Sequence, residues 1–310
     1  MNSLDDAIAA YERRGYRLDM IMPADAPRVA VVSNAKEMLR LVATDGGVQA
    51  EPFLGLGHPV IPPSSQEFVI TRVSAPAAWI TGRAGLQYRD LIPGRLGGRY
   101  IASHIRITEG GPVGDYVHHH RVRFQIIFVR KGWVRVVYED QGPPFVMHEG
   151  DCVLQPPGIR HRVLESSPGL EVIEIGCPAE HETFRDHELS LPTATLNPKR
   201  NFDGQHFVHH IAADAPWQQG EGFEFRDTGI AKATNNLAGV RIVRPRTFTR
   251  THNGDFLFLS VLKGRVKLAG TTLGEHTLEA DDACTIPSGA DYTLTAEAND
   301  EILEVALPAR

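Results

Sequence analysis

Three histidines in one part of the sequence have the types and spacing of metal ligands. His118 and His120 are separated by one residue, so in an extended strand both side chains point to the same face while His119 points away. His161 follows a rigid Pro-Pro-Gly turn at residues 156–158, which can reverse the chain and bring a third imidazole opposite the pair. Imidazoles that converge in this way predict a site for a divalent transition metal.

Gln125 is a candidate for a fourth ligand through its side-chain oxygen. It lies an odd number of residues beyond His120, so it joins the same site only if a turn or bulge at residues 121–123 resets the strand alternation. Imidazoles and an amide form an uncharged ligand set, which leaves the full positive charge on the ion and lowers the pKa of a bound water or enolic substrate. We expect zinc or iron, and the same ligands also suit manganese, nickel and copper.

His104 is a further candidate ligand, on the strand predicted just before this motif. If the isoleucines at alternate positions pack on one face of residues 101–107, His104 and Arg106 share the other face, which could line a barrel lumen. His104 would then be a fourth imidazole at the ion. The alternative is that His104 supports the ligands without touching the metal.

Short strands must position these residues. From residue 98 onward apolar and polar residues alternate in short runs that Gly, Pro and Asp interrupt. Together with the content of 29 Gly and 21 Pro, this pattern predicts an antiparallel β-barrel or sandwich. The strands are expected at residues 100–107, 124–130, 133–139, 145–148, 152–155, 161–165 and 170–175.

A second set of strands between residues 223 and 307 repeats the first set. The segment 151–161 aligns with the segment 282–292, with Asp, Pro and Gly in step, so we predict two barrels of one kind. Only one imidazole of the ligand set survives in the second barrel, and we therefore expect it to bind no metal. The residues at its four ligand positions are Arg250, His252, Leu257 and Tyr292.

The sequence predicts three regions. Residues 1–75 form a small mixed α and β element and a connector, with a helix expected at residues 3–13 behind a Ser3 cap. Residues 76–190 form the metal-binding barrel, and residues 191–310 form the barrel that lacks the ligands. The predicted fold class is therefore all-β, with a small α/β element at the N-terminus and two tandem barrels.

The residues around the candidate ligands resemble the two conserved motifs of the cupin superfamily. Its first motif is Gly, a spacer, His-x-His, four residues, Glu or Gln, six residues and Gly, and its second is Gly-Asp, four residues, Pro-x-Gly, two residues and His. The chain differs from the commoner pattern at Gln125, where the superfamily usually has Glu. The resemblance implies two tandem cupin β-barrels of the jelly-roll or double-stranded β-helix type, with the metal in the first. The matching residues are Gly114, His118, His120, Gln125 and Gly132, and then Gly150, Asp151, Pro156, Gly158 and His161.

With His104 included, the pattern is similar to that of zinc-dependent bicupin polyketide cyclases, whose metal is held by several histidines and a glutamine in the first barrel. This resemblance implies Lewis-acid cyclase or isomerase chemistry on an oxygenated aromatic or polyketide-like molecule, because five protein ligands leave an octahedral ion one open position. Four ligands leave two, and the alternative is a non-heme dioxygenase of the quercetinase kind. A cupin that only binds a small ligand is the second alternative. The sequence identifies no side chain for general acid or base catalysis.

Composition limits the partners of the protein. The formal charge of -6 and the lack of a Lys/Arg run argue against nucleic acid, and no stretch of eighteen apolar residues is present to span a membrane. The 3 cysteines, an odd number, favour free thiols in a reducing compartment, and the acidic N-terminus lacks the features of a secretion signal. We expect a cytoplasmic enzyme whose partner is a small-molecule substrate, and a homodimer is left open.

Overall fold

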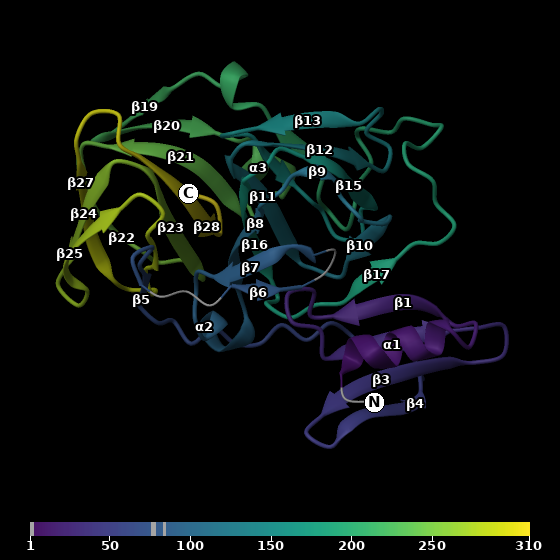
Figure 1. Ribbon diagram of the computed structural model, residues 1–310. Coiled ribbons are helices and arrows are strands. Elements are labelled where there is room, and N and C mark those ends of the chain that lie inside the picture. The colour runs from purple at the N-terminus through teal and green to yellow at the C-terminus, as the bar shows by residue number, and fades with distance from the viewer. Residues whose placement is uncertain (1–2, 76–78, 83–84) are drawn as a thin grey trace.

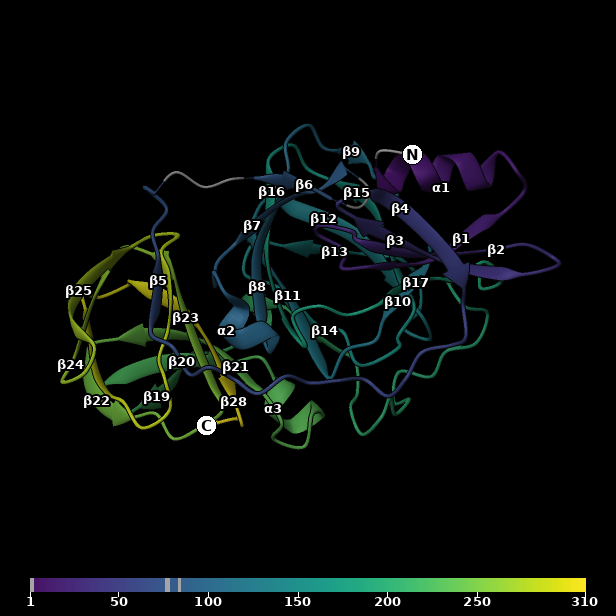
Figure 2. The same cartoon turned by 90° about the horizontal axis from the view of Figure 1, so that it is seen from below.

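The computed structural model describes residues 3–75, 79–82 and 85–310, and it has the all-β architecture predicted from the sequence. Figure 1 shows two β-barrels side by side, with a small N-terminal element attached to the first barrel. The perpendicular view separates the same three parts (Figure 2). The prediction of two tandem barrels is confirmed.

Two sheets, here called I and II, face each other across the interior of the first barrel. Sheet I contains the histidine-rich strand and continues into the N-terminal strands, and all its strand pairs are antiparallel. In spatial order sheet I contains β13 (Phe145–His148), β12 (Trp133–Tyr138), β15 (His161–Ser166), β10 (His118–His120), β17 (Thr183–Arg185), β1 (Arg17–Met22), β2 (Val29–Ser33), β3 (Met38–Thr44) and β4 (Gly47–Pro52), with β9 (Gly111–Pro112) paired to β15. Sheet II contains β18 (Val208–His210), β14 (Cys152–Leu154), β11 (Phe124–Lys131), β16 (Leu170–Cys177), β8 (Ile101–Ile107), β7 (Gln87–Asp90) and β6 (Ile80–Thr81).

Alternation along the strands of sheet II separates an inner face from an outer face. On β11 the side chains of Ile127 and Val129 belong to the interior of the first barrel, whereas Ile126 and Phe128 belong to a different cluster outside it. Apolar side chains of sheet I, such as Val134, complete the interior cluster. The outer face of sheet II is therefore also apolar and must be covered.

The second barrel has the same plan, with sheets III and IV. Its interior is filled by apolar side chains, among them Leu257, Leu268 and Leu294. Sheet III contains, in spatial order, β19 (Gln218–Gly220), β20 (Phe223–Asp227), β21 (Gly239–Pro245), β28 (Glu301–Leu307), β23 (Phe256–Lys263), β26 (Ala283–Thr285) and β5 (Val69–Thr71). Sheet IV contains β22 (Thr247–Thr251), β27 (Asp291–Ala296), β24 (Arg265–Gly270) and β25 (Gly274–Glu279).

Sheets II and III join the two barrels through their outer faces. One buried hydrophobic cluster contains Phe128 from the first barrel and Phe258 and Leu303 from the second, and removing this apolar surface from water stabilises the pair of barrels. Two strands also cross over. β5, from the predicted N-terminal region, pairs with β26 of the second barrel, and β18, from the predicted second-barrel region, pairs with β14 of the first. The boundaries at residues 75 and 190 stay a prediction.

The N-terminal element is attached to the edge of sheet I. Its helix α1 (Leu4–Glu12) begins behind Ser3, whose side chain accepts a hydrogen bond from the Asp6 backbone N–H at 3.1 Å, as the capping pattern predicted. The helix packs on β2 and β3, and β1 pairs with β17, the strand beside the histidines. Within the described residues, short helical segments also lie in connections elsewhere, namely α2 (Arg95–Gly98), η2 (Ala212–Asp214) and α3 (Ile230–Ala233).

The cysteines Cys152, Cys177 and Cys284 are free, as predicted, and all three are buried. Burial raises the pKa of Cys177 to about 11 and that of Cys284 to about 12, so both remain thiols near neutral pH. Within the described residues, no helix combines the length and the apolar character needed to cross a bilayer.

Candidate metal centre

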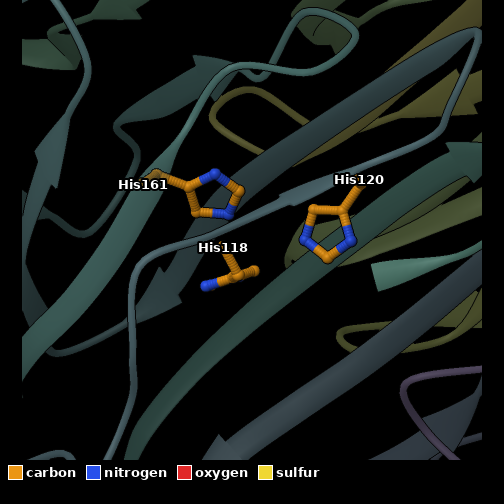
Figure 3. A group of neighbouring side chains, drawn as sticks. All are labelled: His118, His120 and His161. Carbon is orange, nitrogen blue, oxygen red and sulfur yellow. The ribbon is translucent and has the colours of Figure 1, made fainter. Parts of the chain in front are cut away.

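Three imidazoles meet on the inner face of sheet I. His118 and His120 alternate along β10, and the backbone of His118 lies directly opposite that of His161 on the antiparallel strand β15. The three residues are buried, with exposed fractions of 1%, 7% and 4%. One nitrogen atom from each ring lies within 4.8 Å of those of the other two, and Figure 3 shows the rings grouped around a common space. The structure thus brings together the three histidines whose spacing suggested a metal site.

Backbone carbonyls fix the tautomers of two of these rings. Nδ1 of His118 lies 2.8 Å from the carbonyl oxygen of Tyr116, and Nδ1 of His161 lies 3.0 Å from that of Ile159. A carbonyl oxygen can only accept a hydrogen bond, so in the neutral rings Nδ1 carries the proton and Nε2 carries the lone pair. Each of these two rings therefore has the tautomer that binds a metal through Nε2.

The third ring is oriented from the neighbouring strand. Nδ1 of His120 lies 3.0 Å from Oγ1 of Thr183 on β17, and a hydroxyl oxygen can accept the Nδ1 proton there. Hydrogen bonds on the outer nitrogen hold a ligand ring in place and make its inner nitrogen more basic. All three rings thus have the surroundings that imidazole ligands usually have.

Gln125 reaches the site from the facing sheet. Residues 121–123 carry the chain from β10 in sheet I to β11 in sheet II, so a change of sheet replaces the bulge that the sequence analysis required. The side chain lines the same cavity as the three histidines, and its Nε2 donates to Oε1 of Glu174 at 2.5 Å. Its Oε1 is buried and has no hydrogen-bond partner in the described part of the chain. A cation would satisfy this oxygen, so the residues fit a bound metal ion.

Glu174 is a site residue that the sequence analysis missed. It lies on the inner face of β16 and lines the cavity beside Gln125. A lone carboxylate on a strand is normally exposed to solvent, and no local motif marks this one as lining a lumen. The internal repeat could have identified it, because a glutamate occupies the same strand position in both barrels: Glu174 in the first and Glu304 in the second.

Apolar side chains form most of the wall of the cavity, whose volume is about 100 Å³. The ring of Tyr138 lies 5.4 Å from that of His161, and its hydroxyl accepts a hydrogen bond of 2.8 Å from Nε2 of Gln155. Burial raises the pKa of Tyr138, so its phenol stays protonated. Walls of this kind exclude water and strengthen electrostatic interactions inside. The aliphatic wall residues include Ile105, Ile107, Ile127, Val134, Val136, Met147, Val163, Leu170 and Val172.

His104 does not join the three histidines. Ile105 and Ile107 line the lumen, so the alternation along β8 turns His104 to the outer face of sheet II. Its Nε2 lies there 2.8 Å from Oε2 of Glu171, and its Nδ1 lies 3.2 Å from Nη2 of Arg89. The structure corrects the expectation that His104 faces the lumen, because the apolar side chains of this strand fill the barrel interior.

The second barrel keeps the backbone of this site but not its side chains. Arg250 lies opposite Tyr292 in the same register in which His118 lies opposite His161. Leu257, at the position of Gln125, is part of the apolar core. A guanidinium group, a phenol and an aliphatic chain therefore occupy three of the four ligand positions.

The remaining histidine of the second barrel has the opposite tautomer. His252 is 0% exposed, and its Nδ1 lies 2.5 Å from Nη2 of Arg310, which can only donate. The neutral ring therefore carries its proton on Nε2. Burial, and next the positive charge of Arg310, lower the pKa of His252 to about 4.

Residues 103–175, which contain the three histidines and Glu174, match the family model of the cupin domain. This part of the chain is similar to a cupin domain. It covers most of the first barrel, and the cupin motifs around His118 and His161 lie within it. A search of curated protein sequences gave no match.

Solved structures with similar folds include an oxalate decarboxylase. A mutant of oxalate decarboxylase from Bacillus subtilis is 11% identical in sequence, with a TM-score of 0.56 over 82% of this chain and 79% of that chain. The protein Ylba from E. coli is 12% identical, with a TM-score of 0.55 over 82% of this chain and 96% of that chain. At these identities the similarity concerns the fold, and it supports two tandem cupin barrels.

Proposed function

We propose that the chain is a metal-dependent bicupin enzyme, with Nε2 of His118, His120 and His161 and Oε1 of Gln125 as the metal ligands. The observation that carries the proposal is the set of oriented rings. A hydrogen bond holds each ring at its Nδ1, and one nitrogen atom of each ring lies within 4.8 Å of those of the other two. The buried amide oxygen of Gln125 supplies the fourth donor. All four ligands are neutral, so the ion keeps its full positive charge.

The reaction that this site supports best is Lewis-acid isomerisation or cyclisation of an enolisable substrate. When bound, the ion polarises a carbonyl oxygen and stabilises the negative charge that develops there. Glu174 is the proton acceptor that the cavity offers. Its carboxylate is held in place by the hydrogen bond from Gln125 Nε2 and can take a proton from the carbon next to the carbonyl and return it at another position.

The size and polarity of the cavity limit the substrate. Its volume of about 100 Å³ is below the ~300 Å³ at which sites for drug-sized ligands begin. We therefore propose a small oxygenated molecule, either a single aromatic ring or the reactive end of a polyketide-like chain. The mostly aliphatic wall favours such a molecule over a phosphorylated one.

Zinc and iron are the ions we propose first, with manganese, nickel and copper as further options, because imidazole suits them all. One structure of the Bacillus subtilis oxalate decarboxylase is described as containing Mn(II) centres, and this favours including manganese in any test. Zinc cannot change its oxidation state, so the identity of the ion separates Lewis-acid chemistry from oxygen chemistry.

The position of His104 favours a second candidate function, a non-heme dioxygenase acting on an aromatic or enolic substrate. Its side chain pairs with Glu171 outside the lumen, so the protein offers four ligands instead of five. Four ligands leave an octahedral ion two open positions, which dioxygen chemistry needs and simple Lewis-acid catalysis does not.

Metal analysis combined with isotope exchange tests the proposal. Protein purified without added metal is analysed for bound metals and then incubated in D2O with small β-dicarbonyl compounds, hydroxyaromatics and flavonols while oxygen uptake is recorded. We expect one metal per barrel pair and deuterium incorporation next to the carbonyl without oxygen uptake. Glu174→Gln is the matched variant, since it should retain the metal and lose the exchange.

Three other outcomes would change the proposal. Iron or copper with substrate-dependent oxygen uptake would replace the isomerase with the dioxygenase. Tight binding of a compound without turnover would favour a cupin that only binds a ligand. A protein that retains no metal would contradict the assigned ligands.

A further inference from the structure

The second barrel has a cavity of its own, of about 390 Å³. Three arginines, Arg241, Arg250 and Arg310, contribute to its wall together with Thr251, Asn253 and Gly254. Its wall therefore differs from that of the first cavity, which is mostly aliphatic. A cavity with several guanidinium groups is suited to an anion.

The positive charge of this cavity is only partly neutralised. Arg241 forms a buried ion pair with Glu304, including a bond of 3.1 Å from its Nε. Within the described residues, the ion pairs of the second barrel do not include Arg250 or Arg310. Two guanidinium groups thus have no carboxylate partner there, and a ligand with two negative charges would balance them.

Neutral contacts fix both of these guanidinium groups. Arg250 lies over the rings of Phe223 and Phe248, at 4.5 Å and 4.9 Å from their centroids. Arg310 donates to the hydroxyl of Tyr292 at 2.6 Å and to Nδ1 of His252 at 2.5 Å. Aromatic contacts and neutral acceptors orient a cation without removing its charge, so both groups are prepared to bind an anion.

The two guanidinium groups lie at positions that correspond to the metal site of the first barrel. Arg250 has the strand position of His118, and Arg310 contacts Tyr292 and His252, the equivalents of His161 and His120. The second barrel has therefore replaced ligands for a cation with fixed cations. The equivalent positions of the two barrels therefore suit ligands of opposite charge.

We propose that the second barrel binds a small dianion whose charges are carried by oxygen atoms, with Arg250 and Arg310 as the main ligands. Each guanidinium can form paired hydrogen bonds with a carboxylate or phosphoryl group. Asn253, which also lines the cavity, can donate from its side-chain amide. This binding site is separate from the proposed active site and does not depend on the reaction there.

Calorimetric titration with malonate and with inorganic phosphate tests this proposal. The titrations use the full chain carrying His118→Ala and treated with a chelator, because either anion could otherwise bind a metal in the first barrel. We expect saturable binding of at least one of them at one site per chain, and no binding of malonamide, which has the shape of malonate without its charge. The ratio of the two affinities distinguishes a carboxylate ligand from a phosphoryl ligand.

Substitutions assign the binding to the cavity. Arg250→Gln and Arg310→Gln should each weaken binding at least about tenfold, since a hydrogen bond to a charged group contributes about 1.5 to 3 kcal/mol. Arg265→Gln is the matched control: it makes the same change at an exposed residue of β24 that pairs with Glu279. If Arg250→Gln fails to fold, Arg250→Lys replaces it. This variant keeps the charge and should weaken binding less than the loss of at least about tenfold expected for Arg310→Gln.

Thermal unfolding of every variant is measured first, and titrations are done well below the lowest midpoint. The proposal is overturned if neither anion binds saturably, if malonamide binds as well as malonate, or if the three Arg→Gln variants bind equally well.

Discussion

At equivalent strand positions, the two barrels carry side chains suited to ligands of opposite charge. His118 faces His161 across adjacent strands in the first barrel, and Arg250 faces Tyr292 in the same register in the second. The first barrel presents neutral nitrogen atoms that can hold a cation, whereas the second holds guanidinium groups. The backbone register was therefore retained while the chemistry at the site changed.

A comparison of His118 with His252 shows that one hydrogen-bond partner can decide whether an imidazole can bind a metal. In the first barrel a carbonyl accepts from Nδ1 of His118 and leaves its Nε2 as the ligand atom. In the second barrel Arg310 donates to Nδ1 of His252, which places the proton on the nitrogen that would have to bind a metal. The partner of the outer nitrogen decides whether a buried imidazole suits a metal ion.

Loss of a first-barrel ligand should have the largest effect. His118→Ala removes one of three imidazoles that share the site, so we expect metal affinity to fall by more than about 100-fold and activity to fall to background. Elemental analysis after dialysis against a weak chelator measures the change. Arg250→Ala is the control at the same position of the second barrel, and it should leave the metal content unchanged. Equal metal loss in both variants would contradict the asymmetry between the barrels.

The equivalent glutamates give the next largest contrast. Glu174→Gln should lower kcat by about 10² to 10⁴ at unchanged metal content, because it removes the proton acceptor in the cavity. Glu304→Gln should leave kcat and metal content unchanged. It should instead lower the free energy of unfolding by about 3 kcal/mol, since Arg241 then remains buried without its negative partner. Steady-state kinetics and urea unfolding measure the two effects, and a kcat loss in Glu304→Gln would remove the distinction.

Acid should destabilise the second barrel through His252. Folding holds the pKa of His252 at about 4, below its ordinary value of 6.5, so between these pH values the unfolded chain binds more protons than the folded one. Stability is therefore lost as the pH falls from 6.5 toward 4, by about 3 kcal/mol for this group. Urea unfolding of the wild type and of His252→Gln across this range measures the difference. A stability difference between the two proteins that does not change with pH would contradict the buried neutral ring.

Strand positions and the two-barrel repeat could be predicted from the sequence because they depend on local alternation and on the spacing of turns. The face that a strand turns to the lumen depends on the sheet packed opposite. For this reason His104 was expected inside, although Ile105 fills that side. Glu174 was missed for a related reason, because a single acidic residue on a strand gives no sign of being enclosed.

Strand pairings between segments far apart in the chain could not be predicted from the sequence either. β5 joins a sheet of the second barrel and β18 joins a sheet of the first, and no local pattern marks a three-residue strand as a partner of a segment far away in the chain. Gln125 lines the cavity as expected, but no strand bulge brings it there. The chain instead changes sheets between His120 and Gln125. Side-chain type and spacing thus predicted that the three histidines and Gln125 line one cavity, but not the route that brings them together.

The smallest effect is expected from the residue that orients His120 from outside. Thr183 Oγ1 lies 3.0 Å from Nδ1 of His120, and Thr183→Val replaces the hydroxyl by a methyl group of similar size in a position that is 0% exposed. We expect metal affinity to fall by about 10- to 100-fold, because the ring loses the hydrogen bond that orients it. Competition with a coloured chelator measures the affinity, and Thr183→Ser, which keeps the hydroxyl, should retain most of it. If Thr183→Val and Thr183→Ser lower metal affinity equally, packing and not the hydrogen bond orients His120. The difference between His120 and His252 would then depend on Arg310 alone.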